Sequence, residues 1–182
     1  MDKQNASNDG IVIVYTGNGK GKTTASLGVA LRAIGHGLKV CMVQFIKGEW
    51  HYGELNSLKK LEPDFELIVA GKGFIGIIDD DHPFEEHVKA AKTALDIVEQ
   101  KISLDIFDII ILDEINYALH LGLLQLSDVM KVIQYRPKRL SLILTGNYAC
   151  EEIILSADLV TEMKEIKHPY KQGLKAKRGI DF

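Results

Sequence analysis

The chain has 182 residues, of which 46% are hydrophobic and 26% are charged, and its formal net charge is -3. This length and composition predict one globular domain with a substantial core. The negative charge excludes a surface built throughout for nucleic acid, and no apolar run is long enough to span a bilayer. Cys41 and Cys150 are isolated and no signal peptide is visible, so we expect reduced thiols, a cytoplasmic location, and neither nucleic-acid nor membrane partners.

The first ten residues are polar and predict a flexible arm, whereas residues 11–182 predict a single domain. The apolar run 11–15 predicts the first strand, and Thr-Gly-Asn-Gly-Lys-Gly-Lys-Thr-Thr follows it at 16–24. A strand, a glycine-rich turn and a helix that starts with Gly-Lys-Thr are the layout of a phosphate-binding loop.

Each part of this P-loop has a physical purpose. Glycines let several backbone N–H groups point at one anion, and the following helix adds its positive dipole end. Lys22 places an ammonium on the phosphates, and the Thr23 hydroxyl can ligate a magnesium ion. The usual pattern has glycine where Thr16 stands, so a Gly/Lys-rich surface turn is the alternative interpretation.

Helical and strand patterns then alternate along the chain. Apolar residues at helical spacing predict a helix over 23–33, which Gly35-His36-Gly37 ends. The further elements expected are strands at 38–46, 65–70, 107–112, 140–145 and 159–163, and helices at 54–61, 83–102, 127–134 (capped by Ser127) and 151–156. This alternation predicts an α/β fold with a mostly parallel sheet, helices on both faces, and ligands at the carboxyl ends of the strands.

The apolar strand at 107–112 ends in Asp113 and Glu114. An unpaired carboxylate there is costly, whereas beside a phosphate loop such acids hold magnesium directly or through its water shell. The alternative is a helix N-cap by Asp113 with Glu114 in the first turn. Glu114 fits either an ATP hydrolase, where it positions water, or an enzyme with another nucleophile, where it is a metal ligand. No guanine-reading Asn-Lys-x-Asp motif is present, which favours ATP over GTP.

Further motifs narrow the interpretation. They are Val43-Gln44-Phe45-Ile46-Lys47-Gly48, Leu112-Asp113-Glu114, the segment 157–163 (Ala-Asp-Leu-Val-Thr-Glu-Met), and the ending Lys167-His168-Pro169-Tyr170, Gly173, Lys175-Ala176 and Gly179-Ile180-Asp181-Phe182. Together with the P-loop, these motifs resemble the P-loop corrinoid adenosyltransferase family of the CobA/BtuR type. The resemblance runs in order from Ile11 to Phe182, and Thr16 belongs to this family's own form of the loop.

The resemblance implies a RecA-like P-loop fold and transfer of the 5′-deoxyadenosyl group of ATP to the cobalt of a reduced corrinoid. The corrinoid would be cob(I)alamin or a cobinamide-type precursor, and triphosphate would be the leaving group. The enzyme would act in the biosynthesis or salvage of adenosylcobalamin. It also implies Mg²⁺ or Mn²⁺, an electron donor such as reduced flavin or flavodoxin, and a homodimer. Cobalt(I) is itself a strong nucleophile, so the chain needs no Ser-His-Asp or Cys-His pair.

The same resemblance assigns residues to roles. Lys22, Thr23 and Glu114 would be catalytic, and Thr23, Asp113 and Glu114 would hold the metal. Phe74 would meet the lower face of the corrin, although a phenylalanine that caps the core is the alternative. ATP would contact Gly17, Asn18, Gly19, Lys20, Gly21, Lys22, Thr23, Thr24 and Arg32, the last of which is otherwise an exposed helix charge.

Two positions depart from common forms of the family. Gly76 stands where some members carry tryptophan, and Asn147 stands where many carry arginine. For Gly76 the resemblance implies either a different way of displacing the corrinoid's lower ligand or a preference for an incomplete corrinoid. For Asn147 it implies a phosphate contact that is weaker or supplied from elsewhere. The competing functions are an ordinary P-loop ATPase or kinase, and a non-enzymatic carrier of nucleotide or corrinoid.

Overall fold

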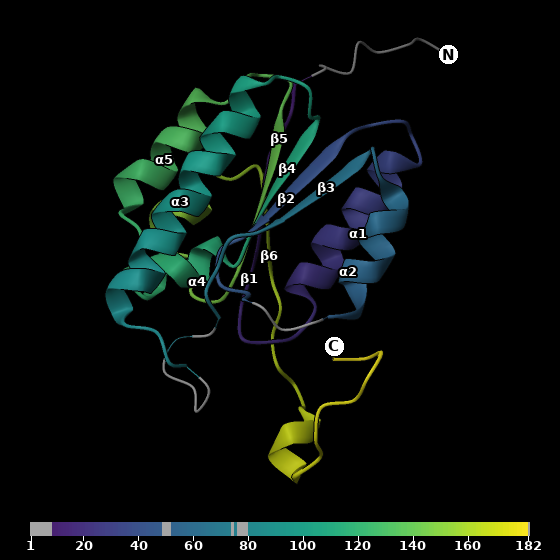
Figure 1. Cartoon of the computed structure of the whole chain (residues 1–182), viewed down its shortest axis with the longest axis vertical. Helices are drawn as coiled ribbons and strands as arrows, with labels where there is room; N and C mark the ends of the chain where they lie inside the picture. Colours follow the sequence, from purple (N-terminus) through teal and green to yellow (C-terminus); the bar gives the residue numbers. More distant parts are fainter. Residues whose placement is uncertain (1–8, 49–51, 74, 76–79, 182) are drawn as a thin grey trace.

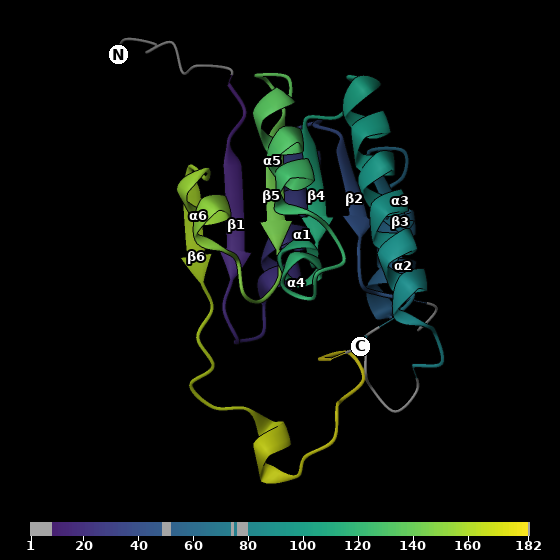
Figure 2. The same cartoon turned by 90° about the vertical axis from the view of Figure 1, so that its left-hand side faces the viewer.

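The protein is a parallel β-sheet between two layers of helices (Figures 1 and 2). The computed structural model describes residues 9–48, 52–73, 75 and 80–181. Every strand pairing is parallel, and the sheet order is β3-β2-β4-β5-β1-β6. The strands are β1 (Val12–Thr16), β2 (Val40–Gln44), β3 (Phe65–Val69), β4 (Ile109–Asp113), β5 (Ser141–Thr145) and β6 (Leu159–Glu162).

The helices cover both faces of the sheet, as the alternating pattern predicts. Figure 1 shows helices packed on each of the two sides of the sheet. The first side has α1 (Lys22–Ile34) and α2 (Gly53–Leu58), and the second has α3 (Phe84–Ser103), α4 (Ile115–His120) and α5 (Leu126–Tyr135). Helix α6 (Glu151–Leu155) and the 3₁₀ turns η1 (Lys59–Leu61) and η2 (Pro169–Gln172) complete the described elements.

The core consists of two clusters of buried apolar residues, one on each face of the sheet. Strand β4 shows why, since successive side chains of a strand point to opposite faces. Ile110 and Leu112 lie in the cluster beneath α3 and α5, whereas Ile109 and Ile111 lie in the cluster beneath α1. A central parallel strand therefore has an apolar run without polar alternation.

The predicted elements are confirmed, with boundaries within three residues of the observed ones. The cap prediction for Ser127 is wrong, because α5 begins at Leu126 with Gln125 at the N-cap position. Helix α4 and turn η2 were not predicted. The N-cap alternative for Asp113 is also wrong, because Glu114 occupies the cap position of α4.

All strands run in one direction, so their carboxyl ends form a single edge of the sheet. The segments that leave this edge include the P-loop after β1, α4 after β4, and the C-terminal tail after β6 (Figure 2). Residues 1–8 of the expected arm lie outside the described residues, and the arm remains a prediction. In the part of the chain that the structure describes, no helix has the length and apolar character needed to cross a bilayer.

The packing of β4 gives a stability prediction. Ile111 is 0% exposed, whereas Leu31 on α1 is 61% exposed. Ile111→Ala is expected to lower the free energy of unfolding by about 2–5 kcal/mol, because it removes buried methyl groups and leaves a cavity. Leu31→Ala should change it by about 0.5 kcal/mol or less. Urea unfolding of both variants measures this, and equal losses would contradict the assignment of the core.

Candidate functional site

The Asp113 carboxylate is the centre of the site, and it is completely buried at the end of β4. Its Oδ1 accepts hydrogen bonds from Thr23 Oγ1 at 2.9 Å and from Thr145 Oγ1 at 2.8 Å. Its Oδ2 accepts one from Gln44 Nε2 at 3.1 Å, and the Lys47 ammonium lies 3.9 Å from this atom. These contacts replace the water that a buried carboxylate loses.

The sheet order explains how these groups meet. Strand β4 lies between β2 and β5, so Gln44 and Thr145, the last residues of those strands, flank Asp113. Gln44 is the direct register partner of Asp113. Thr23 reaches the same carboxylate from the first turn of α1. Asp113 therefore connects the P-loop helix to three strand ends.

Glu114 is positioned by its backbone. Its N–H donates to Thr145 Oγ1 at 2.9 Å, and its φ of 64° places it in the left-handed region, where a non-glycine residue is uncommon. Strain of this kind is often found at functional sites. Burial and, secondly, the Asp113 charge raise the pKa of Glu114 to about 7, while Lys22 and Lys47 act in the opposite direction.

Lys22 lies inside the curve of the P-loop. Its Nζ donates to the carbonyl oxygens of Gly17 and Gly19, both at 2.8 Å. Burial lowers the pKa of Lys22, and the charges of Glu114 and Asp113 partly offset this effect. The loop backbone thus holds a cation beside the acidic pair.

The C-terminal tail, residues 163–181, is attached to the P-loop. Gly19 N–H donates to the Met163 carbonyl at 2.6 Å, and Asn18 Oδ1 accepts from Glu165 N–H at 3.0 Å. Lys20 forms an ion pair with Asp181 at the other end of the tail. Both ends of the tail therefore lie against the same loop.

Glycine is required in this loop because the tail passes so close. A Cβ atom at Gly17 would lie 2.5 Å from the Met163 carbonyl oxygen, and one at Gly19 would lie 2.8 Å from it. Gly17 and Gly21 also have φ angles of 95° and 110°, which side chains disfavour. The spacing of the glycines thus serves the tail contact as well as the fold of the loop.

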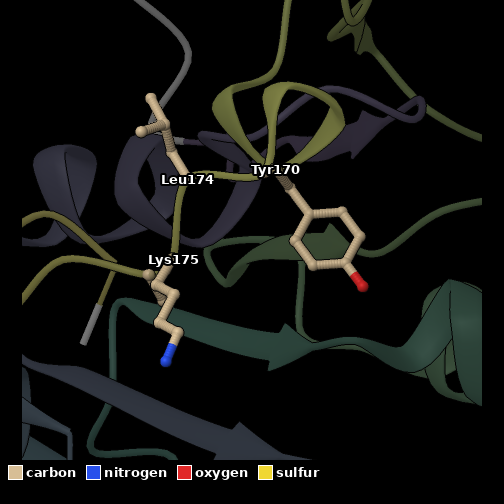
Figure 3. Close-up of a pocket in the computed structure, with 5 residues that line it drawn as sticks. Tyr170, Leu174 and Lys175 are labelled. Atoms are coloured by element: carbon tan, nitrogen blue, oxygen red, sulfur yellow. The ribbon is translucent and has the colours of Figure 1, made fainter.

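Between its two attachments the tail projects beyond the carboxyl edge of the sheet (Figure 2). It forms a hollow of about 530 Å³ lined by Tyr170, Gly173, Leu174, Lys175 and Ala176. Figure 3 shows Tyr170, Leu174 and Lys175 projecting from this segment. The hollow is therefore built from the C-terminal motif and not from the P-loop or the acidic pair.

A second cation lies on the other side of the acidic pair. Lys47 follows β2, and its side chain is only 12% exposed. Its Nζ lies 2.9 Å from Glu54 Oε1 and 4.7 Å from the centre of the Tyr52 ring. Lys47 and Lys22 therefore flank Asp113 and Glu114 with positive charge.

The structure brings together only part of the set that the sequence predicts. The P-loop, Lys22, Thr23, Asp113 and Glu114 lie at one edge of the sheet. Thr24 is exposed on the first turn of α1. Arg32 is exposed in the last turn, which lies roughly 15 Å along the helix axis from Lys22. Phe74 and Gly76 lie outside the described residues.

Sequence reasoning missed the groups that organise Asp113. Gln44 and Thr145 are polar residues at the carboxyl ends of otherwise apolar strands, and ligand sites of parallel sheets lie at these ends. Their position at the strand ends was the sequence signal that could have identified them as site residues. Gln44 and Lys47 both belong to the motif at residues 43–48, but only the fold brings them to the Asp113 carboxylate.

The oxygen donors at this edge suit a hard divalent cation. Thr23 donates its hydroxyl proton to Asp113, which leaves the oxygen lone pairs free for a metal. Across the ranges that the structure describes, no group of three or more His, Cys, Asp or Glu side chains could hold a metal ion. Magnesium commonly takes its remaining ligands from phosphates and water, so the set fits Mg²⁺ together with a bound nucleotide.

Comparison with known proteins gives the family. Residues 8–182 match the family described as ATP:corrinoid adenosyltransferase BtuR/CobO/CobP. The chain belongs to this ATP:corrinoid adenosyltransferase family. It is 38% identical over 173 residues to the corrinoid adenosyltransferase of Escherichia coli K12, a match that covers 95% of this chain and 86% of the relative. It is 36% identical over 178 residues to corrinoid adenosyltransferase CobA of Salmonella typhimurium, with the same coverage.

Membership of the corrinoid adenosyltransferase family makes the chain a transferase that acts on ATP and a corrinoid. The corrinoid adenosyltransferase of Pseudomonas aeruginosa is 37% identical over 95% of the chain. The flagellar accessory protein FlaH of Methanocaldococcus jannaschii has a similar structure, with a TM-score of 0.53 and 16% identity over 85% of this chain and 71% of its own. That likeness concerns the fold alone, and the RecA-like α/β P-loop fold is confirmed.

The pKa of Glu114 gives a prediction for pH dependence. Between pH 4.5 and about 7 the folded protein keeps a proton that the unfolded chain has released. The stability of the protein without metal or nucleotide should therefore fall by about 3 kcal/mol as the pH rises through this window. Glu114→Gln carries no titrating proton and should lose this fall, whereas the exposed control Glu99→Gln should keep it. Urea unfolding at pH 4.5 and pH 8 tests this, and identical pH profiles in all three proteins would refute it.

Proposed function

We propose that this chain transfers the 5′-deoxyadenosyl group of ATP to the cobalt of a reduced corrinoid, with triphosphate as the leaving group. One observation carries the assignment of residues: at the carboxyl edge of the sheet, the Thr23 hydroxyl binds Asp113, and the charges of Lys22 and Glu114 act on each other. The membership of the family supports the reaction itself.

In this proposal the P-loop binds the triphosphate of ATP through Gly17 to Thr24. Lys22 neutralises the charge that develops on the triphosphate as it leaves. Its contacts with two loop carbonyls support this role, because they hold the ammonium where the loop curves. Groups fixed in advance need no reorganisation during the reaction.

Thr23 and Glu114 would hold Mg²⁺ or Mn²⁺, and Asp113 would act mainly by orienting the Thr23 hydroxyl. The three donors that already bind Asp113 support this division. When bound, the metal supplies positive charge to the triphosphate. Lys47 adds charge on the opposite side of Asp113.

The nucleophile in this proposal is the cobalt(I) of the corrinoid. Its electron pair forms the bond to C5′ of ATP, and the C5′–O bond breaks with its electrons going to the triphosphate. The protein's task is to align the two substrates, and such alignment can supply ~7–11 kcal/mol of the barrier. A side-chain nucleophile is not needed. Phe74 remains the proposed contact with the lower face of the corrin.

We further propose a homodimer and a cytoplasmic enzyme that receives its corrinoid after reduction by a flavin or flavodoxin. The edge strand β6 offers one surface for a second copy, because all four of its residues are exposed, and Leu155 at the end of the preceding helix α6 is also exposed. Sedimentation equilibrium of the full chain measures the mass in solution, and a monomer at micromolar concentration would contradict this point.

Lys22→Ala tests the role of the P-loop cation. Loss of one group that stabilises developing charge typically costs about 10²–10³ in rate, so we expect this loss in adenosyl transfer. The exposed control Lys60→Ala should retain wild-type activity. The assay is anaerobic incubation with ATP, Mg²⁺ and chemically reduced cobalamin, followed by the light-sensitive absorbance of the cobalt–carbon product and by triphosphate release.

The same assay separates the competing functions. Free phosphate formed from ATP without any corrinoid would indicate an ordinary ATPase, and Glu114→Gln should then abolish turnover while ATP still binds. Tight binding of both ligands with no transfer under strong reduction would indicate a carrier.

A further inference from the structure

Three aromatic side chains gather at the carboxyl edge of the sheet and have no role in the function above. Tyr117 and His120 lie on α4, and Tyr148 follows β5. The rings of His120 and Tyr148 stack with centroids 4.1 Å apart and an interplanar angle of 27°. Tyr117 lies 6.2 Å from each of the other two rings. These three residues are the aromatic cluster.

The backbone of Tyr148 is held in an unfavourable conformation. Its φ is 60°, in the left-handed region that a bulky residue rarely adopts. The residue is nevertheless 57% exposed, and its stacking partner His120 is exposed as well. Burial of the ring therefore does not explain the strain, and strained residues are concentrated at ligand-binding sites.

The aromatic cluster lies beside the P-loop. Ala149, the residue after Tyr148, donates its N–H to Thr16 Oγ1 at 3.1 Å, and Thr16 directly precedes the first glycine of the loop. The exit of β5 also packs against α4, since a Cβ at Gly146 would lie 2.8 Å from the Tyr117 nitrogen. Helix α4 itself begins immediately after Glu114. A molecule held by the P-loop and the acidic pair thus has the cluster as its neighbour.

We propose that the aromatic cluster is a stacking site for a planar nitrogen heterocycle that belongs to one of the two substrates. An exposed tyrosine ring that is itself stacked on an imidazole offers a flat face of the kind on which bases stack. Two sources supply this chemistry: the adenine of ATP, and the base that a complete corrinoid carries below its ring. The contact with Thr16 favours a ligand that also occupies the P-loop, which is adenine.

The test compares Tyr148→Leu, which removes the ring, with the matched control Tyr148→Phe, which keeps it. Binding to the full chain with Mg²⁺ is measured by calorimetry for two pairs of probes. ATP is paired with inorganic triphosphate, and cobalamin is paired with base-free cobinamide. The proposal rests on the proposed function for the choice of these probes.

Loss of one stacked base weakens binding by about 10-fold. We expect Tyr148→Leu to weaken one base-bearing probe by this factor, to leave its base-free partner unchanged, and Tyr148→Phe to bind as the wild type does. Weaker ATP binding identifies adenine as the ligand, and weaker cobalamin binding identifies the corrinoid base. Unchanged binding of both ATP and cobalamin overturns the proposal. So does a base-free probe that is weakened as much as its base-bearing partner. A wild-type protein that binds neither ATP nor cobalamin overturns it as well.

The outcome is independent of the transfer assay. A wild-type protein that binds ATP but forms no cobalt–carbon product contradicts the proposed function. Calorimetry on that protein and its Tyr148 variants would still measure whether Tyr148 contacts a base.

Discussion

The buried Asp113 carboxylate is the interaction on which the rest of the site depends. A charge with no exposure to water is tolerated only when its hydrogen bonds are replaced, and here Thr23, Thr145 and Gln44 replace them. Each donor comes from a different element, so these contacts fix α1 and the ends of β2 and β5 relative to β4. Glu114 follows directly and receives its orientation from Thr145.

The P-loop has a second structural constraint in the C-terminal tail. The Met163 carbonyl lies where side chains on Gly17 or Gly19 would have to be. Asn18, Lys20 and Gly19 use polar groups to bind the tail in this structure. The C-terminal ending, which is the most specific motif of the sequence, therefore contacts the same loop that binds the nucleotide in our proposal.

The electrostatics of the site agree with a reaction in which negative charge builds up on a leaving group. Lys22 and Lys47 lie on either side of two acidic residues, which a divalent cation would also neutralise. The raised pKa of Glu114 reflects how strongly burial and the Asp113 charge disfavour its ionised form. A nucleophile delivered by the corrinoid explains why this charged site needs no activated serine or cysteine.

The sequence by itself determined the alternation of strands and helices, the P-loop and the acidic ending of β4, because apolar periodicity and glycine spacing are local properties. It did not predict α4, since six residues are too few for a helical period to be seen. It gave Asp113 two interpretations, because sequence spacing does not tell which strands are neighbours. Only the sheet order puts Gln44 and Thr145 on either side of Asp113, and only the tertiary path of the tail brings Asp181 to Lys20 across 161 positions. Contacts between residues so distant in the chain depend on packing, and packing is decided by the whole fold at once.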